Sequence, residues 1–584
     1  MDDPLRRRRR SRLACALFAT LPVAVPAAAP LASESSQGMV VTSQHLASDV
    51  GATILRGGGN AIDAAVAVGF ALAVTHPCCG NLGGGGFMTI HFADGRDTFI
   101  NFRETAPLAA RANMYLDAHG KPDPARSLRG YLAAGVPGTV MGLETARAKY
   151  GTMQRAALLR PAIRLAEQGF LLTPGDVDIL DAAKTVFSNE PNVAAIFLNQ
   201  GRSFAPGERL VQQNLAATLH AISEGGIQAF YHGGIAATIA AESAAHGGLL
   251  TTEDFAAYTV TESAPIKCLY RGYTIATAPP PSSGGVTLCE MLRILEGYPL
   301  GALGYHSSQS VHFMTEAMRY AYHDRNRYLG DPAFVDNPID RLLSDANAGA
   351  IRGHIAAHRA SISSALGLDA APAEKPTTTH YSVVDRLGNA VSVTFTINDD
   401  FGAKVIAADT GFFLNDEMDD FAAKPGMPNL YGLVQGNANS IAPGKRPLSS
   451  MTPTIILNDG RPVMVVGTPG GSRIITTVLE IIVNVIDHGM SLQEAVDAPR
   501  FHHQWLPDTL AAEPFALSAD TAAALTRMGY RVTPLEKWGA GNAAEVIGIA
   551  PADPRAAAAM HFPHPGVFYG AADARAPAGS AAVP

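Results

Sequence analysis

Two β-forming runs joined by a tight turn constrain this chain most strongly. Residues 377–385 read Thr-Thr-Thr-His-Tyr-Ser-Val-Val-Asp, and residues 390–396 read Ala-Val-Ser-Val-Thr-Phe-Thr. The turn between them ends in Gly-Asn, which supplies residues that tolerate positive φ, so the pattern predicts a hairpin. A hairpin centred on the middle of this turn places Thr396 opposite Thr378, with both hydroxyls at its open end.

Two opposed hydroxyls at the end of a hairpin suit a threonine nucleophile that a second threonine steadies. A threonine hydroxyl is weak unless a base lies beside it. A free α-amine, with a pKa of roughly 7.7–8.0, can be that base. Cleavage of the Thr377–Thr378 bond would place amine and hydroxyl on one residue. Composition alone leaves three threonines as candidates, and the register favours Thr378. The ordinary alternative is that the threonines only begin a strand.

Six ordered motifs of this chain resemble the gamma-glutamyltranspeptidase family, in which the chain cuts itself and exposes a threonine as a new N-terminus. The resemblance runs from about Gly38 to near Ala571 and also selects Thr378. Its motifs are Thr-Thr-His-Tyr-Ser at 378–382, Asn-Phe-Arg-Glu at 101–104, Pro-Pro-Pro-Ser-Ser-Gly-Gly at 279–285, Met-Asp-Asp-Phe at 418–421, Lys-Arg-Pro-Leu-Ser-Ser-Met at 445–451 and Pro-Gly-Gly-Ser-Arg at 469–473.

The predicted strands lie toward both ends of the chain and flank a mostly helical middle, residues 137–366, which indicates an α+β enzyme. The resemblance is more specific, because it implies the four-layer αββα sandwich of the N-terminal nucleophile hydrolases. It also implies a large subunit, residues 33–377, and a small subunit, residues 378–584, that form a heterodimer around one core. The Ala/Pro/Gly-rich residues 571–584 are expected to be disordered.

Glycines between a predicted strand, 463–467, and a predicted helix, 474–486, suit the developing oxyanion of acyl transfer. They let backbone N–H groups approach an anion at a helix N-terminus. The resemblance implies that Gly470 and Gly471 form this oxyanion hole and that Thr396 positions the Thr378 hydroxyl. A turn without a chemical role is the alternative.

The resemblance further implies a pocket for the zwitterionic γ-glutamyl group of glutathione and related donors. Arg103 can hold a carboxylate bidentately, and Ser449 and Ser450 would add hydroxyl donors. The ammonium would be held by Asp420, Glu417 and Asn398. Each of these residues also has an ordinary interpretation as a charge pair, a turn cap or a polar loop residue. Their joint fit to one zwitterion favours the functional one.

Residues 425–436 resemble a lid over the donor pocket, with Tyr431 as its gate. Related cephalosporin acylases generally lack this lid and the aspartate at position 420, which favours γ-glutamyl over glutaryl substrates. Glu417 stands where some bacterial members of the family carry glutamine. Asp399 and Asp400 stand where hydroxyl residues are common, so the preferred amino acid or peptide acceptor stays open.

Residues 1–32 predict an export signal: an arginine-rich start, an apolar stretch and an Ala-Ala-Ala site. This leader carries six Arg and two Asp, a net charge of +4. The whole chain has a net charge of −8, so the remaining residues carry −12. An acidic protein of this kind is a poor nucleic-acid binder. We therefore expect a periplasmic or secreted protein. An arginine patch that binds nucleic acid is the alternative for the leader.

Four further features of the chain bear on its function. No segment predicts a stable membrane span. Cys78, Cys79, Cys268 and Cys289 are expected to be buried as small apolar residues, because adjacent cysteines pair with difficulty. Export would permit disulfides, so their disulfide state stays open. His354 and His358 have helical spacing but no adjacent glutamate, so neither a metal site nor a cofactor is predicted. Glycines 83–86 lack the Lys-Ser/Thr of a phosphate loop and predict close backbone packing.

The sequence thus predicts a self-processing γ-glutamyltransferase and glutathione hydrolase. A glutaryl or cephalosporin acylase of the same fold is the nearest alternative. An unprocessed periplasmic homologue that binds amino acids without catalysis is the other.

Overall fold

In a computed structural model of the chain, the predicted hairpin consists of β10 (Thr379–Asp385) and β11 (Ala390–Thr396). Thr379 pairs with Phe395 and Val384 with Ala390, which is the predicted register. Of the two turn residues expected to have positive φ, only Gly388 does. Asp385 stabilises the turn instead, because its carboxylate accepts hydrogen bonds from the backbone N–H groups of Leu387 and Asn389.

The structure describes residues 31–367, 378–535 and 543–584. Nearly all of the expected leader, the loop at 370–376 and Thr377 lie outside the described residues. Residues from Ala32 to Pro584 form one unit, whose backbone is organised around two antiparallel sheets.

The first sheet, which we call the hairpin sheet, contains the two strands that carry the threonines. Its order is β19 (Ser580–Ala582), β2 (Gly38–Thr42), β10, β11, β3 (Gly85–His91), β4 (Asp97–Phe102) and β7 (Thr261–Ser263). The second, facing sheet has the order β1 (Ser33–Ser35), β18 (Phe568–Ala572), β17 (Glu545–Ile549), β13 (Arg461–Val466), β12 (Thr454–Asn458), β9 (Tyr273–Thr277) and β8 (Ile266–Tyr270).

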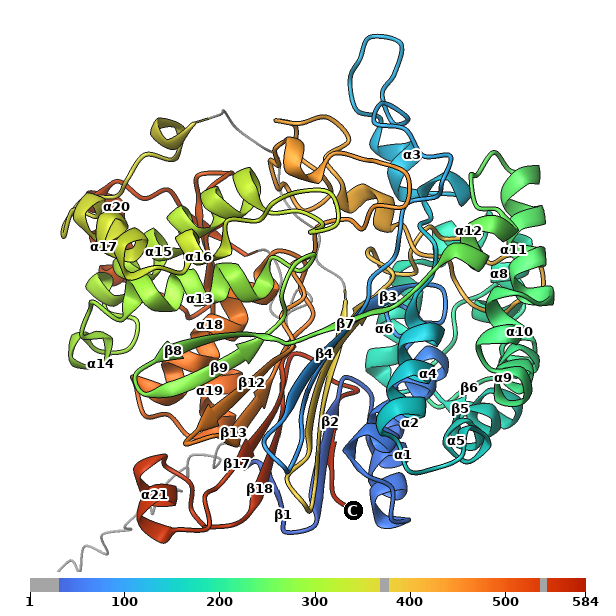
Figure 1. The fold of residues 1–584 in the computed structure, drawn as a ribbon, viewed down its shortest axis with the longest axis horizontal. Coiled ribbons are helices and arrows are strands. Elements are labelled where there is room, and N and C mark those ends of the chain that lie inside the picture. The colour runs from blue at the N-terminus through green and yellow to red at the C-terminus, as the bar shows by residue number, and fades with distance from the viewer. Residues whose placement is uncertain (1–30, 368–377, 536–542) are drawn as a thin grey trace, which may run out of the picture. The chain divides into compact units, whose positions relative to one another are not determined.

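Helices cover the outer face of each sheet, so the layers run helix, sheet, sheet, helix (Figure 1). The helices on the side of the hairpin sheet are α1 (His45–Arg56), α2 (Ala61–Thr75), α3 (Pro124–Leu128), α4 (Thr139–Tyr150), α5 (Arg155–Gln168), α6 (Pro174–Ala182), α7 (Lys184–Phe187), α8 (Pro191–Phe197), α9 (Gln213–Gly225), α10 (Ile227–Tyr231), α11 (Gly234–Ala245) and α12 (Thr252–Ala257).

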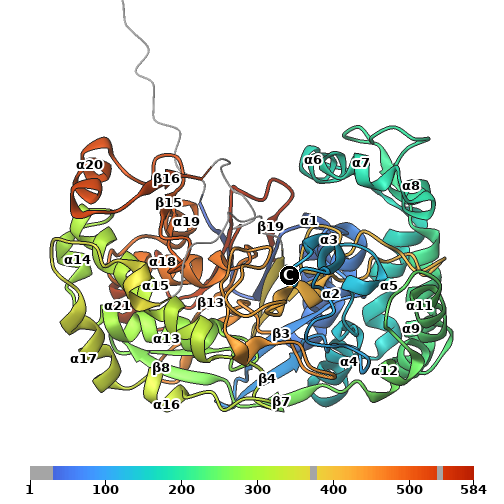
Figure 2. The same ribbon diagram turned by 90° about the horizontal axis from the view of Figure 1, so that it is seen from above.

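On the other side lie α13 (Gly284–Leu295), α14 (Leu300–Leu303), α15 (Ser308–Tyr328), α16 (Ile339–Leu342), α17 (Asp345–His354), α18 (Arg473–Ile486), α19 (Leu492–Asp497), α20 (Ala519–Met528) and α21 (Pro554–Ala559). Figure 2 shows the two helical layers from above, on opposite sides of the strands. Small sheets add β5 (Phe170–Leu171) with β6 (Arg209–Leu210), and β14 (Phe501–His502) with β15 (Leu510–Ala512) and β16 (Val532–Pro534). The predicted αββα sandwich and the helical middle are therefore confirmed.

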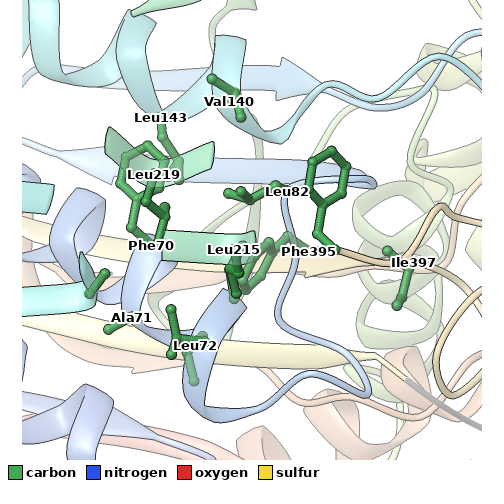
Figure 3. Close-up of a cluster of buried hydrophobic side chains, with 14 of the residues drawn as sticks. Phe70, Ala71, Leu72, Leu82, Val140, Leu143, Leu215, Leu219, Phe395 and Ile397 are labelled. Carbon is green, nitrogen blue, oxygen red and sulfur yellow. The ribbon is translucent and has the colours of Figure 1, made fainter. Parts of the chain in front are cut away.

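Strand alternation decides which way the hairpin presents its hydroxyls. Phe395 and Ile397 point into the core between the hairpin sheet and its helices, where they join Phe70 of α2 and Leu215 of α9 (Figure 3). Because successive side chains point to opposite faces of a strand, Thr396 points the other way, toward the facing sheet. Burial of this apolar cluster thus fixes the direction of the threonine hydroxyl.

Two expectations about the fold were wrong. The tail is not disordered, because Ser580–Ala582 form β19 and extend the hairpin sheet by pairing with β2. The cysteines are buried as expected, but they are not simple apolar residues. Cys268 of β8 and Cys289 of α13 form a disulfide with their Cα atoms 5.9 Å apart, and Cys78 and Cys79 form a second one. Among the described residues, no helix combines the length and apolar character that crossing a membrane requires.

Candidate active site

Thr378 and Thr396 lie together at the open end of the hairpin and line one cavity of about 330 Å³. Both are buried, with 7% and 4% of their surface exposed. The Thr396 hydroxyl oxygen accepts a 2.8 Å hydrogen bond from the backbone N–H of Asn398, which holds it in place. The two threonines that the sequence places at the end of the hairpin therefore line the same cavity.

The glycine run before β3 lets the backbone approach this end of the hairpin closely. A Cβ atom on Gly84 would lie 1.9 Å from the carbonyl oxygen of Thr396, and one on Gly83 would lie 2.1 Å from that of Phe413. Real Cβ atoms do not approach a backbone oxygen so closely, so these positions require glycine. The glycines therefore pack against the loop that follows Thr396, as the sequence predicts.

Arg103 forms the cationic wall of the cavity. It follows β4, is fully buried, and forms ion pairs with Glu417, Asp420 and Glu104. The contact to Glu417 Oε2 is 2.6 Å and that to Glu104 Oε2 is 3.4 Å. Asp420 retains 13% side-chain exposure, whereas Glu417 has 1%. Asp420 therefore faces the cavity, and Glu417 supports Arg103 from behind.

Burial and mutual contact shift the pKa values of this charge cluster. Burial alone would lower the pKa of Arg103, but the carboxylates of Glu417, Asp420 and Glu104 together raise it. Burial raises the pKa of Glu104 to about 7 against the opposing effect of Arg103. Burial likewise raises the pKa of Glu417 well above its ordinary value, and the neighbouring carboxylates add to this effect. The cluster therefore holds more carboxylates than one guanidinium neutralises.

A second arginine, Arg325 of α15, lies on the cavity wall and was not predicted. Its guanidinium donates to the hydroxyl oxygens of Ser450, at 3.0 Å, and Ser283, at 2.8 Å. Burial lowers the pKa of Arg325 to about 10. Ser283 belongs to the Pro-Pro-Pro-Ser-Ser-Gly-Gly motif, whose role the sequence did not give. That motif therefore orients the arginine that holds Ser450.

The turn before α18 brings a strained backbone to the cavity. Gly470 has φ of 133° and Gly471 has φ of 56°, both in the region that favours glycine. Their carbonyl oxygens accept hydrogen bonds from the N–H groups of Arg473 and Ile474, which start the helix. Gly471 lines the cavity; Gly470 directly precedes it in the turn but does not line it.

Three residues of the predicted lid, 425–436, line the cavity: Tyr431, Leu433 and Gln435. Tyr431 is 4% exposed and lies against Gly471, where an added Cβ atom would approach the tyrosine ring to 2.6 Å. Its hydroxyl donates a 2.6 Å hydrogen bond to Oδ1 of Asn398. At the base of the lid, the N–H of Leu430 donates to Asp419, and burial raises the pKa of that carboxyl to about 6.

Most of the predicted site residues meet at this one cavity. Those that line it are Arg103, Thr378, Thr396, Asn398, Asp420, Tyr431, Ser449, Ser450 and Gly471; Glu417 and Gly470 lie directly behind it. The lining residues that were not predicted are Arg325, Leu433, Gln435, Leu448, Met451 and Ile474. Gln435 lies in the predicted lid and Leu448 and Met451 lie in a cited motif, whereas no sequence signal marked Arg325.

Comparison with known proteins agrees with this geometry. The family model described as Gamma-glutamyltranspeptidase matches residues 47–583. A glutathione hydrolase proenzyme from Pseudomonas sp. (strain A14) is 58% identical over 520 residues, covering 89% of this chain and 90% of that protein. One from Escherichia coli (strain K12) is 50% identical over 507 residues, covering 86% and 87%.

A solved structure of similar fold is that of a cephalosporin acylase from Bacillus halodurans. It has a TM-score of 0.81 and 28% identity, and the match covers 100% of this chain and 99% of that chain.

Proposed function

The chain belongs to the gamma-glutamyltranspeptidase family and is an enzyme, and we propose that it hydrolyses glutathione and transfers its γ-glutamyl group with Thr378 as the nucleophile. The observation that carries the residue assignment is the shared cavity. Two threonines, an arginine, an aspartate and two serines line it together, which supports the assignment. These are the groups that an acyl donor with a carboxylate and an ammonium requires.

The nucleophile is made by the chain itself. Hydrolysis of the Thr377–Thr378 peptide bond consumes one water and leaves a carboxylate on Thr377 and an amine on Thr378. That amine then accepts the proton of the Thr378 hydroxyl as its oxygen attacks the γ-amide carbonyl of the donor. Thr396 steadies the attacking oxygen from across the hairpin. The products are a large subunit, 33–377, and a small subunit, 378–584, which stay together because both sheets contain strands from each subunit.

The oxyanion of the tetrahedral intermediate forms next to the turn that precedes α18. The backbone N–H groups of Gly470 and Gly471 are the proposed donors to it. Collapse of the intermediate transfers the amine proton to the leaving nitrogen and produces a γ-glutamyl ester of Thr378. Water, or the amine of an amino acid or peptide, then resolves the ester.

The two poles of the donor have separate partners on the cavity wall. Its α-carboxylate accepts from Arg103, Ser449 and Ser450, and replaces Asp420 on the guanidinium. Asp420, released from that contact, holds the α-ammonium together with Asn398. Glu417 does not line the cavity, so it does not contact the ammonium directly. It acts on donor binding through its ion pair with Arg103.

N-terminal sequencing of the smaller fragment tests the nucleophile. The fragment is expected to begin at Thr378, and Thr378→Ala should remain a single chain without turnover. Thr379→Val is the matched control, because it removes the neighbouring hydroxyl and should still be cleaved. A fragment that begins elsewhere, or full activity in an uncut chain, would refute the assignment.

The second candidate function is that of a glutaryl or cephalosporin acylase, which the similar fold of the Bacillus halodurans protein supports. Asp420 on the cavity wall and the closed lid favour the γ-glutamyl donor instead. Hydrolysis rates of a γ-glutamyl anilide and a glutaryl anilide separate the two, because only the first carries an ammonium. Equal rates would favour the acylase.

We also propose that residues 1–32 direct export to the periplasm or the medium. Cell fractionation, with N-terminal sequencing of the large fragment, tests this. A large fragment that starts near residue 30 and appears outside the cytoplasm is expected, and one that retains residue 1 would contradict it.

A further inference from the structure

A cluster of metal-ligating side chains lies outside the proposed active site, in the turn that follows α2. His76, Cys78 and Cys79 are buried, and their ligand atoms all lie within 4.8 Å of one another. The His76 Nε2 atom is 3.4 Å from Cys78 Sγ. Asp400, from a distant part of the chain, lies at the edge of this group: its Oδ1 is 3.6 Å from Cys79 Sγ, but it is not one of the three residues whose ligand atoms are all within 4.8 Å.

We propose that His76, Cys78, Cys79 and Asp400 form a binding site for a thiophilic divalent cation, Zn²⁺, when the two cysteines are reduced. One imidazole nitrogen, two thiolates and one carboxylate oxygen are donors that Zn²⁺ uses in tetrahedral sites. Ligands at about 2.0–2.3 Å in a tetrahedron are separated from one another by about 3.5 Å. The separations of His76 from Cys78, 3.4 Å, and of Cys79 from Asp400, 3.6 Å, are close to that value. The two sulfurs, which are bonded in this structure, would separate on reduction, and the Asp400 side chain would turn toward His76 and Cys78 when a cation binds.

The turn is held in shape by its own backbone and by its neighbours. The N–H of Cys79 donates to the carbonyl of His76, and Asn81 donates to the carbonyl of Cys79. The N–H of Phe401 donates to the carbonyl of Cys78 at 2.8 Å, which joins the turn to the segment that carries Asp400. The backbone that carries the four donors is therefore fixed before a cation arrives, and only side chains need to move.

A small cavity adjoins the cluster. His76 and Cys78 line it, together with the carboxylate of Asp176 and apolar residues such as Leu172 and Leu180. Two buried cysteines that had only apolar neighbours would be interpreted as small apolar core residues. Here each sulfur has a polar neighbour, the imidazole for Cys78 and the carboxylate for Cys79.

Cation binding requires the thiol form of the pair, which is a disulfide in this structure. Two molecules of a small-molecule thiol supply the two electrons and two protons that convert the disulfide into two thiols, and they leave joined as their own disulfide. Binding of Zn²⁺ then displaces both thiol protons. The pair thus has two alternative states, a disulfide without a cation and a dithiolate with one.

The site touches the segment that leads from the nucleophile hairpin into the pocket. Asp400 lies two residues after Asn398. Asn398 lines the active-site cavity and accepts a hydrogen bond from the hydroxyl of the lid residue Tyr431. Coordination of Asp400 would therefore fix a segment that includes part of the donor pocket.

The test is a titration of the reduced, desalted enzyme with Cd²⁺, which reports thiolate coordination by ultraviolet charge-transfer absorption. One equivalent is expected to saturate the band, and Zn²⁺ should displace it. The Cys78→Ser and Cys79→Ser variants should lose the band, and His76→Ala and Asp400→Asn should weaken binding at least about tenfold. The Cys268→Ser/Cys289→Ser double variant is the matched control and should keep it, while the untreated disulfide form should give no band.

Absence of a one-equivalent band in the reduced enzyme would overturn the proposal, as would a band that survives loss of both Cys78 and Cys79. A second measurement avoids dependence on the folding of these variants. In the reduced wild-type enzyme, Zn²⁺ should slow alkylation of Cys78 and Cys79 at least about tenfold, as measured by peptide mass spectrometry. Equal alkylation rates with and without Zn²⁺ would also overturn it.

Discussion

The hydroxyl of Tyr431 donates a 2.6 Å hydrogen bond to Oδ1 of Asn398 and thereby joins the lid to the segment that follows the nucleophile hairpin. Tyr431 also lies on Gly471, one of the two proposed oxyanion donors. One side chain therefore contacts both the donor pocket and the oxyanion turn. If Tyr431 is the gate proposed for the lid, its release is the step by which a donor gains access to Thr378.

Removal of the Tyr431 hydroxyl should loosen this closure. A single hydrogen bond contributes about 0.5–1.5 kcal/mol, so Tyr431→Phe should reduce the ratio of closed to open lid about 2–13-fold. Water then reaches the γ-glutamyl ester more easily, and hydrolysis should gain over transfer by a similar factor. Product ratios with glycylglycine as acceptor measure this. An unchanged ratio would mean that the hydrogen bond does not govern closure.

A side chain at position 471 should push the lid tyrosine away. Gly471→Ala puts a Cβ atom where the Tyr431 ring now lies, and it also places alanine at a φ that costs about 1–2 kcal/mol. We expect at least about a tenfold loss of kcat. If the clash causes part of that loss, Gly471→Ala should cost less in a Tyr431→Ala background. Full additivity in this double-mutant cycle would show that the backbone effect acts alone.

Arg325 should matter for donor binding although no motif contains it. Lysine at this position keeps the charge but cannot reach Ser283 and Ser450 at once, as the guanidinium does. Arg325→Lys should raise the donor KM about tenfold and change kcat less. Arg327→Lys, an exposed position on the same helix, is the matched control and should leave both constants unchanged. A wild-type KM for Arg325→Lys would remove this residue from the site.

Features that depend on residues close together in the sequence were predicted, and features that depend on contacts between distant segments were missed. The hairpin register follows from alternation and a short turn, both local, so the Thr378–Thr396 pairing could be predicted. Arg325 and the Cys268–Cys289 disulfide depend on how α13 and α15 pack on the facing sheet, which no local pattern encodes. The tail was assigned to disorder by composition, but the exposed edge of β2 offered it a partner.

The resemblance to the family identified the remaining candidate site residues. It could not predict which of them line the cavity and which lie behind its wall. Glu417 and Asp420 are three positions apart in one short 3₁₀ turn, and the sequence assigned them one role. The fold separates them, since Asp420 faces the cavity and Glu417 faces the back of Arg103. Such a distinction depends on the orientation of one turn against β4.

Glu104 should make stability depend on pH. Its pKa of about 7 lies above the ordinary 4.5 because the folded protein favours the protonated form. Protonation of Glu104 therefore stabilises the folded protein by at most about 3 kcal/mol. This stabilisation is fully present below pH 4.5 and is lost as the pH rises through 7. Glu104→Gln should therefore lose less unfolding free energy than wild type between pH 5 and pH 8. Denaturant unfolding measures this, with the exposed Glu224→Gln as control; equal losses in all three proteins would contradict the prediction.

Arg103 both neutralises buried carboxylates and is proposed to bind the donor, so the two roles need different substitutions. Arg103→Ala would leave Glu417 and Glu104 without a buried counter-charge, and breaking such a pair costs about 3–5 kcal/mol of stability. Arg103→Lys keeps a cation but loses the planar guanidinium that reaches two carboxylates and a substrate together.

We expect the Arg103→Lys enzyme to fold and to undergo self-cleavage normally, and its donor KM to rise by about two orders of magnitude. Arg386→Lys, on the exposed hairpin turn, should behave as wild type. An Arg103→Lys enzyme with an unchanged KM would show that the donor carboxylate binds elsewhere, and the charge cluster would then be purely structural.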